Sequence, residues 1–208
     1  MTPAHESPHG AALPVPSHTA LLHRGDKELR AAAFAFMRPF LDRENEALFC
    51  FGEPSVGEGL VRQLERRAGR DLSADQRAGR IVFGQSEPDV DRQLENVIGP
   101  LEDFRAKGFE LVRFIGIVAW DTPSFPPPED FLWFESKLTD LIAPYPVIAL
   151  CPYDILALPA RAIAYGALET HPLVISDGSL RQNPQFIPSD RYLEERLLRL
   201  PWLTTRRS

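Results

Sequence analysis

The chain has little of two features that mark specialised protein classes. Only two of its 208 residues are cysteine, Cys50 and Cys151, which is too few for the disulfide framework of a small secreted domain. No apolar run approaches the ~18–20 residues that a membrane-spanning helix needs, and we find no secretory signal. Both cysteines fall in predicted interior strands. We therefore expect free thiols, a location in the reducing cytoplasm and no association with a membrane.

Positive charge is also scarce. Lysine and arginine together number 23 against 29 aspartate and glutamate residues, which gives a net charge of -6. Because affinity for nucleic acid comes from clustered lysine and arginine, we expect no nucleic-acid partner. What the chain does have is an apolar fraction of 44% over 208 residues. That length and composition suit one globular domain with a sizeable core.

The order of the segments predicts an α/β domain. Residues 1–17 show no hydrophobic periodicity and predict a flexible tail, and residues 201–208 form a second tail. Between them, short apolar runs alternate with amphipathic stretches, which predicts one domain over residues 18–200. In this domain a mainly parallel sheet is flanked by helices in three layers. The predicted strands cover residues 19–22, 47–51, 81–83, 111–120, 147–151 and 173–175, and the predicted helices cover residues 26–41, 56–68, 88–107, 129–142, 159–170 and 189–200.

Arg113 is the most informative single residue, because it interrupts the apolar run over residues 111–120. Such a run is typical of a central strand covered on both faces. A guanidinium does not lose its proton and cannot stay unpaired there. Glu135 falls among the apolar positions of the predicted helix over 129–142. We therefore predict a buried Arg113–Glu135 ion pair, which either is purely structural or also lines a ligand pocket.

Further candidate ligand-binding residues follow the carboxyl ends of predicted strands, where open parallel sheets bind ligands. They are His23, Trp120, Cys151, Tyr153 and Asp154. Aromatic rings, a carboxylate and a thiol beside a crevice suit a pocket for a small molecule. Each residue also fits an ordinary structural role, the thiol as a small core side chain and the last two residues as a turn.

Two observations argue against catalysis. In residues 52–59, two glycines flank four other residues after a strand, as they do in a phosphate loop. However, Glu58 and Gly59 stand where that loop has lysine and a hydroxyl, and a carboxylate repels a triphosphate. No serine or cysteine lies in the sequence context of a nucleophile. We expect a strand-to-helix turn here, no catalytic residue and no cofactor.

The histidines and cysteines raise the question of a metal site. No two of His18, His23, His171, Cys50 and Cys151 have the short spacing of metal ligands on a helix or knuckle. His18 and His171 lie at the starts of predicted strands, whereas His23, Cys50 and Cys151 lie at the ends of theirs. We therefore expect the two groups at opposite ends of the sheet, and we predict no metal site.

Structural roles are expected for three residues. His18 and His171 lie at the starts of strands, and Gly178 follows Asp177 in a sequence typical of a tight turn.

Several segments together resemble the MEDS domain, a sensory domain of methanogens and methylotrophs. The segments are His18, residues 109–120, Glu135, Cys151-Pro152-Tyr153-Asp154, Thr170-His171-Pro172, Gly178 and Asn183-Pro184. The resemblance covers about residues 18–195. It implies a fold related to the RecA-like clock ATPases but without their phosphate loop. The corresponding segment, residues 23–28, has one glycine and no Gly-Lys-Thr.

The resemblance also implies a function. Such domains are usually bacterial sensory modules joined to histidine kinases, helix-turn-helix repressors or anti-sigma kinases, and are proposed to sense simple hydrocarbon derivatives. We see no output domain here. We therefore expect a stand-alone sensory domain that binds a small organic ligand and signals through a separate protein or by forming a homodimer.

The alternative is a scaffold for protein interactions that has lost its ligand. Leu193, Leu197 and Leu200 form a stripe on the last predicted helix, and Trp202 follows it. Tryptophan is favoured at the centres of interfaces. The stripe equally suits packing on the domain's own core.

Overall fold

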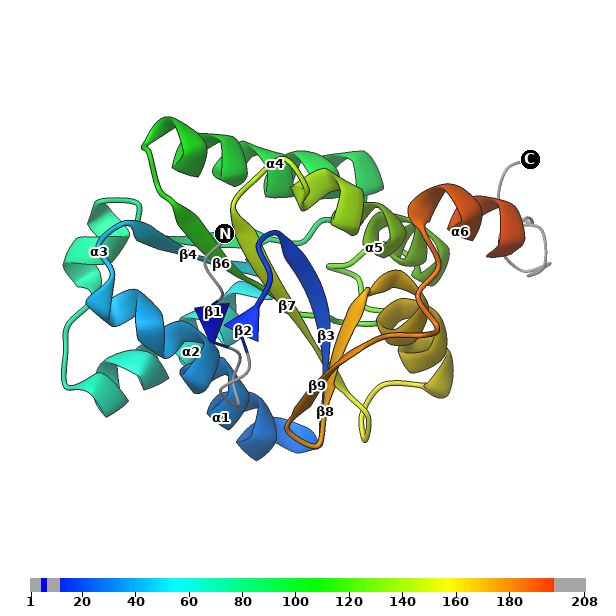
Figure 1. Ribbon diagram of the computed structural model, residues 1–208, viewed down its shortest axis with the longest axis horizontal. Helices are drawn as coiled ribbons and strands as arrows, with labels where there is room; N and C mark the ends of the chain where they lie inside the picture. The colour runs from blue at the N-terminus through cyan, green and yellow to red at the C-terminus, as the bar shows by residue number, and fades with distance from the viewer. Residues whose placement is uncertain (1–4, 7–11, 197–208) are drawn as a thin grey trace.

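The computed structural model describes residues 5–6 and 12–196, and its centre is a seven-stranded sheet (Figure 1). The strands are β3 (Ser17–His23), β4 (Glu46–Gly52), β5 (Ile81–Gln85), β6 (Leu111–Gly116), β7 (Val147–Asp154), β8 (Leu173–Ser176) and β9 (Ser179–Gln182). Their order across the sheet is β5-β4-β6-β7-β3-β8-β9. All neighbours are parallel except the β8–β9 hairpin. The expected mainly parallel α/β sheet is confirmed.

Helices cover both faces of this sheet, so the expected three layers are also confirmed (Figure 1). The helices are α1 (Gly25–Met37), the 3-10 helix η1 (Arg38–Asp42), α2 (Pro54–Ala68), α3 (Ser73–Arg77), α4 (Val90–Ala106), α5 (Pro128–Ile142), the π-helix η2 (Ala162–Leu168) and α6 (Ser189–Arg196). Following the chain, the connections through α1 and α2 lead to strands nearer the β5 edge of the sheet. The connections through α4, α5 and η2 lead in the opposite direction, toward the β9 edge. Because such crossovers are right-handed, the two groups lie on opposite faces.

Successive residues of each strand face opposite helix layers. On one face, Leu48 of β4 and Ile115 of β6 pack with α1 and α2. On the other, Phe49 and Phe114 pack with α4 and α5, and their rings stack with centroids 5.0 Å apart. We call these the α1 face and the α5 face. This division decides which buried polar groups can meet.

The N-terminal segment differs from the expectation of a tail. Strands β1 (His5–Glu6) and β2 (Ala12–Leu13) form a short antiparallel pair. Leu13 is fully buried and packs in the cluster on the α1 face. The prediction of a flexible tail is therefore wrong at least for residues 12–17. Two-residue strands carry no periodicity that composition could reveal.

Two strand ends also differ from the prediction. The strand expected over residues 111–120 ends at Gly116, and β7 continues to Asp154 beyond the expected end at Cys151. The last residue pair between β6 and β7 is Ile115 with Leu150, so Pro152 lies beyond the part of β7 that pairs with β6. No backbone N–H is needed there for pairing with β6, which is why proline, which lacks one, is accommodated. The apparent strand breaker is therefore tolerated.

The C-terminal third contains two details that the sequence pattern missed. The helix predicted over residues 159–170 contains the π-helix η2, whose wide turns often occur at functional sites. Strand β9 follows β8 through Asp177 and Gly178, whose φ angles are 47° and 76°. Positive φ at both central residues is typical of two-residue hairpin turns. The predicted turn at Gly178 is therefore confirmed.

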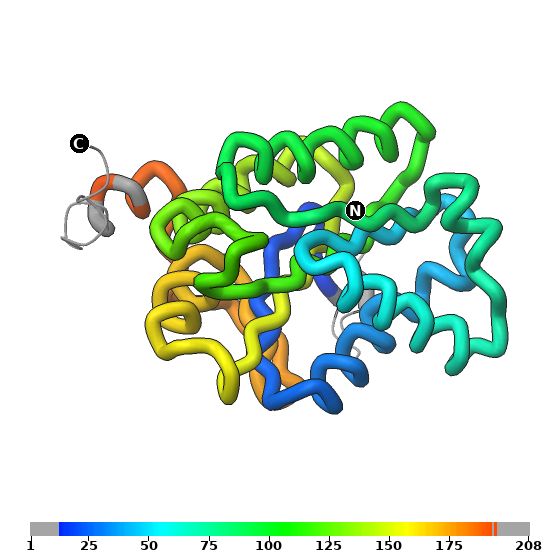
Figure 2. Tube along the Cα trace, turned by 180° about the vertical axis from the view of Figure 1, so that it is seen from behind, coloured from blue at the N-terminus to red at the C-terminus, as the bar shows by residue number. Residues whose placement is uncertain are grey.

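Helix α6 lies at one end of the molecule, as both views show (Figures 1 and 2). Its Tyr192 is buried, and the hydroxyl donates to the backbone oxygen of Tyr165 at 3.2 Å. The predicted leucine stripe with Trp202, and the tail over residues 201–208, fall outside the residues whose side chains are described. None of the helices in the described ranges combines the length and apolar character needed to cross a bilayer.

Candidate functional site

Arg113 is completely buried, as predicted, but its partner is Glu46. The guanidinium Nε donates to Glu46 Oε2 at 2.6 Å, and Nη2 donates to Oε1 at 3.3 Å. Nη1 donates to the backbone oxygen of Phe36 in α1 at 2.9 Å. Glu46 also pairs with Arg43 at 2.7 Å. Every nitrogen of this guanidinium therefore has a protein acceptor.

The predicted pairing of Arg113 with Glu135 is wrong, because the two residues lie on opposite faces of the sheet. Arg113 lies two residues from both Leu111 and Ile115 and shares their face, which is toward α1, whereas α5 covers the other face. Glu46 is the first residue of β4, directly before the predicted strand over 47–51. The Arg113–Glu46 pair ties β4, β6 and α1 together.

Glu135 instead lies in a second buried cluster on the α5 face. Its Oε2 is 3.6 Å from His18 Nε2 and 3.5 Å from His171 Nε2. Cys151 Sγ is 3.5 Å from His18 Nε2. One oxygen, one sulfur and two ring nitrogens from these four residues lie within 4.8 Å of one another. We call His18, Glu135, Cys151 and His171 the four-residue cluster.

The sheet register brings His18 and Cys151 together. His18 of β3 pairs with Ala149 of β7, and Cys151 lies two residues further along β7 on the same face. The expectation that His18 and Cys151 lie at opposite ends of the sheet is therefore wrong. The prediction ended β7 too early, which made a mid-strand residue look terminal.

His171 reaches the cluster from the end of the π-helix segment. Its ring lies against that of His18, with centroids 3.8 Å apart. Its Nδ1 donates to the backbone oxygen of Gly166 at 3.1 Å. The Thr170 hydroxyl also donates to that oxygen and lies 3.0 Å from the same Nδ1. These contacts fix the direction of the His171 ring.

His18 is held in a similar way. Its Nδ1 lies 2.9 Å from Thr139 Oγ1, and that hydroxyl donates in turn to the backbone oxygen of Thr170 at 3.5 Å. The 2.9 Å contact holds the His18 ring in place and turns its Nε2 toward Glu135 and Cys151. The Nε2 atoms of both histidines face the middle of the cluster.

Burial disfavours the charged forms of these groups. It raises the pKa of Glu135 to about 8 and lowers that of His171 to about 3. Burial, with a smaller contribution from His171, also lowers the pKa of His18 well below 6.5. Burial raises the pKa of Cys151 well above its usual value, as does the neighbouring Glu135. Left to itself, the cluster is therefore uncharged near neutral pH.

Two atoms of the cluster have no hydrogen-bond partner among the described residues, Glu135 Oε2 and His171 Nε2. Their separation of 3.5 Å is too long for a good hydrogen bond between nitrogen and oxygen. The nearby Tyr153 hydroxyl is also buried without a partner in the described part of the chain. Such atoms are rare in native proteins and call for an explanation.

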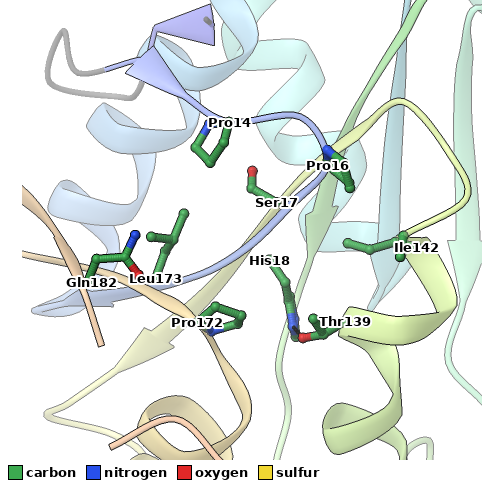
Figure 3. A pocket seen from close by; sticks show the side chains of 10 residues that line it. Pro14, Pro16, Ser17, His18, Thr139, Ile142, Pro172, Leu173 and Gln182 are labelled. Carbon is green, nitrogen blue, oxygen red and sulfur yellow. Dashed lines mark hydrogen bonds between the residues drawn. The ribbon is translucent and has the colours of Figure 1, made fainter. Parts of the chain in front are cut away.

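A pocket of about 220 Å³ opens beside His18 (Figure 3). Figure 3 shows the His18 ring directed toward Thr139. The other residues that line the pocket come from α5 and the segment after it, from around the starts of β3 and β8, and from β9. They are Pro14, Pro16, Ser17, Ile142, Ala143, Pro172, Leu173 and Gln182. We call this the His18 pocket.

The predicted crevice beside Trp120 and Tyr153 is filled by side chains. Trp120 is only 9% exposed and packs edge to face against Phe131, with centroids 5.7 Å apart. Tyr153 is fully buried beneath η2, where its ring lies edge to face against His171. Tyr153 therefore packs beside the four-residue cluster, whereas Trp120 belongs to a separate apolar core with Phe131.

Asp154 and His23 are paired at the carboxyl ends of β7 and β3, as predicted from their positions. Asp154 Oδ1 accepts hydrogen bonds from the backbone nitrogens of Gly25 and Leu156 at 3.2 and 2.9 Å. The carboxylate thus fixes two loops. His23 and Gly178 line a separate pocket of about 370 Å³, together with Leu21, Leu22, Glu28, Ala31, Ala32 and Asp177.

Comparison with known proteins agrees with the resemblance seen in the sequence. The chain matches the family model described as MEthanogen/methylotroph, DcmR Sensory domain over residues 17–172. Comparison with the curated proteins finds no match. The matched range contains all four members of the cluster and the strands and helix that carry them. The chain belongs to the MEDS family of sensory domains.

Proposed function

We propose that the protein senses a small organic molecule, a simple hydrocarbon derivative, that binds in the His18 pocket. The observation that carries the proposal is a pocket of about 220 Å³ beside a buried polar cluster, in a chain of a sensory family. The role is one of binding and signalling rather than catalysis.

The lining of the pocket suits a short apolar molecule with one polar group. Pro14, Pro16, Ile142 and Leu173 supply apolar surface. Ser17 also lines the pocket, and its buried hydroxyl has no hydrogen-bond partner within the described residues. An alcohol, aldehyde, carboxylate or halide of a few carbons can use this hydroxyl while its carbon atoms contact the apolar wall.

The position of the pocket offers a route for signalling. It is lined by the segment before β3, by α5 and by the β8–β9 hairpin. A ligand shifts a conformational equilibrium only by binding one arrangement more tightly than another. A molecule that touches all three elements favours one relative placement of them, and a separate protein or a second copy of the chain reads that placement.

Thermal-shift measurements with one- to four-carbon alcohols, aldehydes, carboxylic acids and halides test the proposal. We expect a rise in Tm with at least one of these classes. Ala143→Phe places a ring at the exposed rim of the pocket and should abolish the rise. Ala106→Phe is a matched control at the exposed end of α4. No rise with any compound, or equal loss in both variants, contradicts the proposal.

The second candidate function is a scaffold for protein interactions. The filled crevice beside Trp120 and Tyr153 favours it, because a predicted ligand site is closed. A scaffold predicts no stabilisation by small molecules together with self-association. Light scattering after size exclusion, with and without the compounds above, separates the two functions. A ligand-dependent change in oligomeric state supports the sensor, and an unchanging oligomer without ligand binding supports the scaffold.

A further inference from the structure

We propose that the four-residue cluster binds a divalent transition-metal ion, with Zn²⁺ as the best match. His18 and His171 would bind through Nε2, Cys151 through Sγ and Glu135 through Oε2. This proposal does not depend on the organic ligand, and it runs contrary to the expectation from sequence of no metal site. Four arguments support it: spacing, orientation, unpartnered atoms and donor chemistry.

The spacing of the atoms matches the edges of a tetrahedral coordination shell. With Zn–N and Zn–O near 2.0 Å and Zn–S near 2.3 Å, neighbouring ligand atoms lie about 3.3 Å apart, or about 3.5 Å when one is sulfur. Here the two Nε2–Oε2 distances are 3.6 and 3.5 Å, and the Sγ–Nε2 distance is 3.5 Å. These three distances fit the edges of a tetrahedron, and all four atoms lie within 4.8 Å of one another, so the remaining edges shorten by at most about 1.5 Å around an ion.

The two histidines are oriented as metal ligands usually are. Such histidines almost always bond through the other ring nitrogen to a nearby acceptor, which fixes the tautomer and the ring direction. His18 does so through Thr139, and His171 does so through the backbone oxygen of Gly166. In both rings Nδ1 makes this outer contact, and both Nε2 atoms face Glu135.

The unpartnered atoms are the observation that a purely structural cluster does not explain. Glu135 Oε2 and His171 Nε2 are buried without hydrogen-bond partners among the described residues. Coordination to a common ion would satisfy both. A dication also favours the carboxylate and thiolate forms that burial alone disfavours, because it supplies the opposite charge that the cluster lacks.

The donor set selects the class of metal. Two imidazoles, one thiolate and one carboxylate suit Zn²⁺ and neighbouring transition metals, whereas Mg²⁺ and Ca²⁺ prefer six or more oxygen ligands. The thiolate and carboxylate together carry two negative charges, which balance a dication in a buried site. His18 also lines the His18 pocket, which gives an ion a route from the surface.

Binding to the full chain, first freed of metal with a chelator, tests the proposal. Dialysis against Zn²⁺ followed by elemental analysis should find one ion per chain. Replacement by Co²⁺ gives a second readout, because tetrahedral Co²⁺ absorbs in the visible and a Co–thiolate bond adds an absorption band in the near ultraviolet. We expect both signals, and a rise in Tm on adding either metal.

The two cysteines provide a matched pair of variants. Cys50 and Cys151 are both buried and unpaired, but Cys50 lies on the α1 face. Cys151→Ala should remove the thiolate band and weaken metal binding, whereas Cys50→Ala should retain both. Glu135→Gln, which keeps the shape of the side chain, should also weaken binding. Circular dichroism selects the variants that remain folded.

Three results would overturn the proposal. One is the absence of stoichiometric binding of Zn²⁺ or Co²⁺ by the folded wild-type chain. Another is a Co²⁺ complex without a thiolate band. The third is equal loss of binding in Cys50→Ala and Cys151→Ala, since an ion bound in the cluster must distinguish them. The organic compounds bind or fail to bind in a separate measurement on the metal-free chain.

Discussion

Two buried polar clusters lie on opposite faces of one sheet, and they differ in how completely their atoms are partnered. On the α1 face, each guanidinium nitrogen of Arg113 donates to Glu46 or to a backbone oxygen. On the α5 face, Glu135 and His171 each keep a buried atom without a hydrogen-bond partner among the described residues. Burying either cluster costs desolvation free energy, and within the described residues the first cluster offsets more of this cost through its hydrogen bonds.

The difference separates a structural pair from a candidate binding site. A buried charge by itself indicates only that a partner exists, and for Arg113 that partner is part of the fold. In the four-residue cluster, Glu135 Oε2 and His171 Nε2 have no such partner among the described residues, and they are two of the atoms that the proposed ion would bind.

The largest expected effect is the loss of the Arg113 guanidinium. Arg113→Ala should lower the free energy of unfolding by about 3–5 kcal/mol, because it leaves the Glu46 carboxylate buried without its main partner. Urea denaturation measures the change. Replacing both residues with apolar side chains should cost much less. A near-neutral single variant would show that the pair contributes nothing to the fold.

The same substitution at the two buried glutamates should give unequal results. In the metal-free protein, Glu46→Gln should destabilise by about 3 kcal/mol more than Glu135→Gln, because it removes the charge opposite Arg113. Glu135→Gln replaces one neutral group with another, so its effect should stay within about 1 kcal/mol. Parallel denaturation curves provide the test. Equal losses would mean that the clusters do not differ as described.

Thr139→Val should weaken metal binding without removing a ligand. The change deletes the hydroxyl that contacts His18 Nδ1, and loss of such a supporting bond typically lowers metal affinity by about 10–100-fold. Competition with a coloured Zn²⁺ chelator measures the affinity. Thr122→Val, in an exposed loop, is the control. Unchanged affinity in both variants would argue against the proposed orientation of His18.

The smallest expected effect concerns packing beside the four-residue cluster. A Cβ at Gly166 would lie 3.3 Å from Tyr153 Cε1, whereas a Cβ at Gly99 in α4 would meet open space. Gly99→Ala should stabilise by about 0.5–1 kcal/mol, because alanine loses less entropy in a helix. Gly166→Ala should be about 1 kcal/mol less favourable than that. Thermal unfolding of the two variants measures the difference. Equal gains in stability would show that the packing around Gly166 is loose.

The fold class followed from local patterns in the sequence. Alternating apolar runs and amphipathic stretches were enough to predict the parallel sheet and its helices, because both periodicities reflect which side of an element is buried. Elements too short to show a period, such as α3 and β2, were not predicted. Strand β7 was cut short because Pro152 resembles a strand end.

The partners within each cluster could not be predicted, because they depend on strand order. Arg113 and Glu135 were each correctly expected to be buried. Which face α5 covers follows from the crossover direction, and that is known only once β6 and β7 are placed in the sheet. One local signal was available: extending β4 by one residue adds Glu46 to the face of Arg113. The MEDS resemblance already contained all four cluster residues, although not their contacts.

Anomalous X-ray scattering tests the central claim most directly. Crystals of the chain grown with Zn²⁺ and measured on both sides of the zinc absorption edge locate the ion without any assumption about its ligands. We predict one strong peak on the α5 face, about 2.0 Å from the Nε2 atoms of His18 and His171 and about 2.3 Å from Cys151 Sγ. A fully bound Zn²⁺ elsewhere, with no peak among these side chains, would contradict the account.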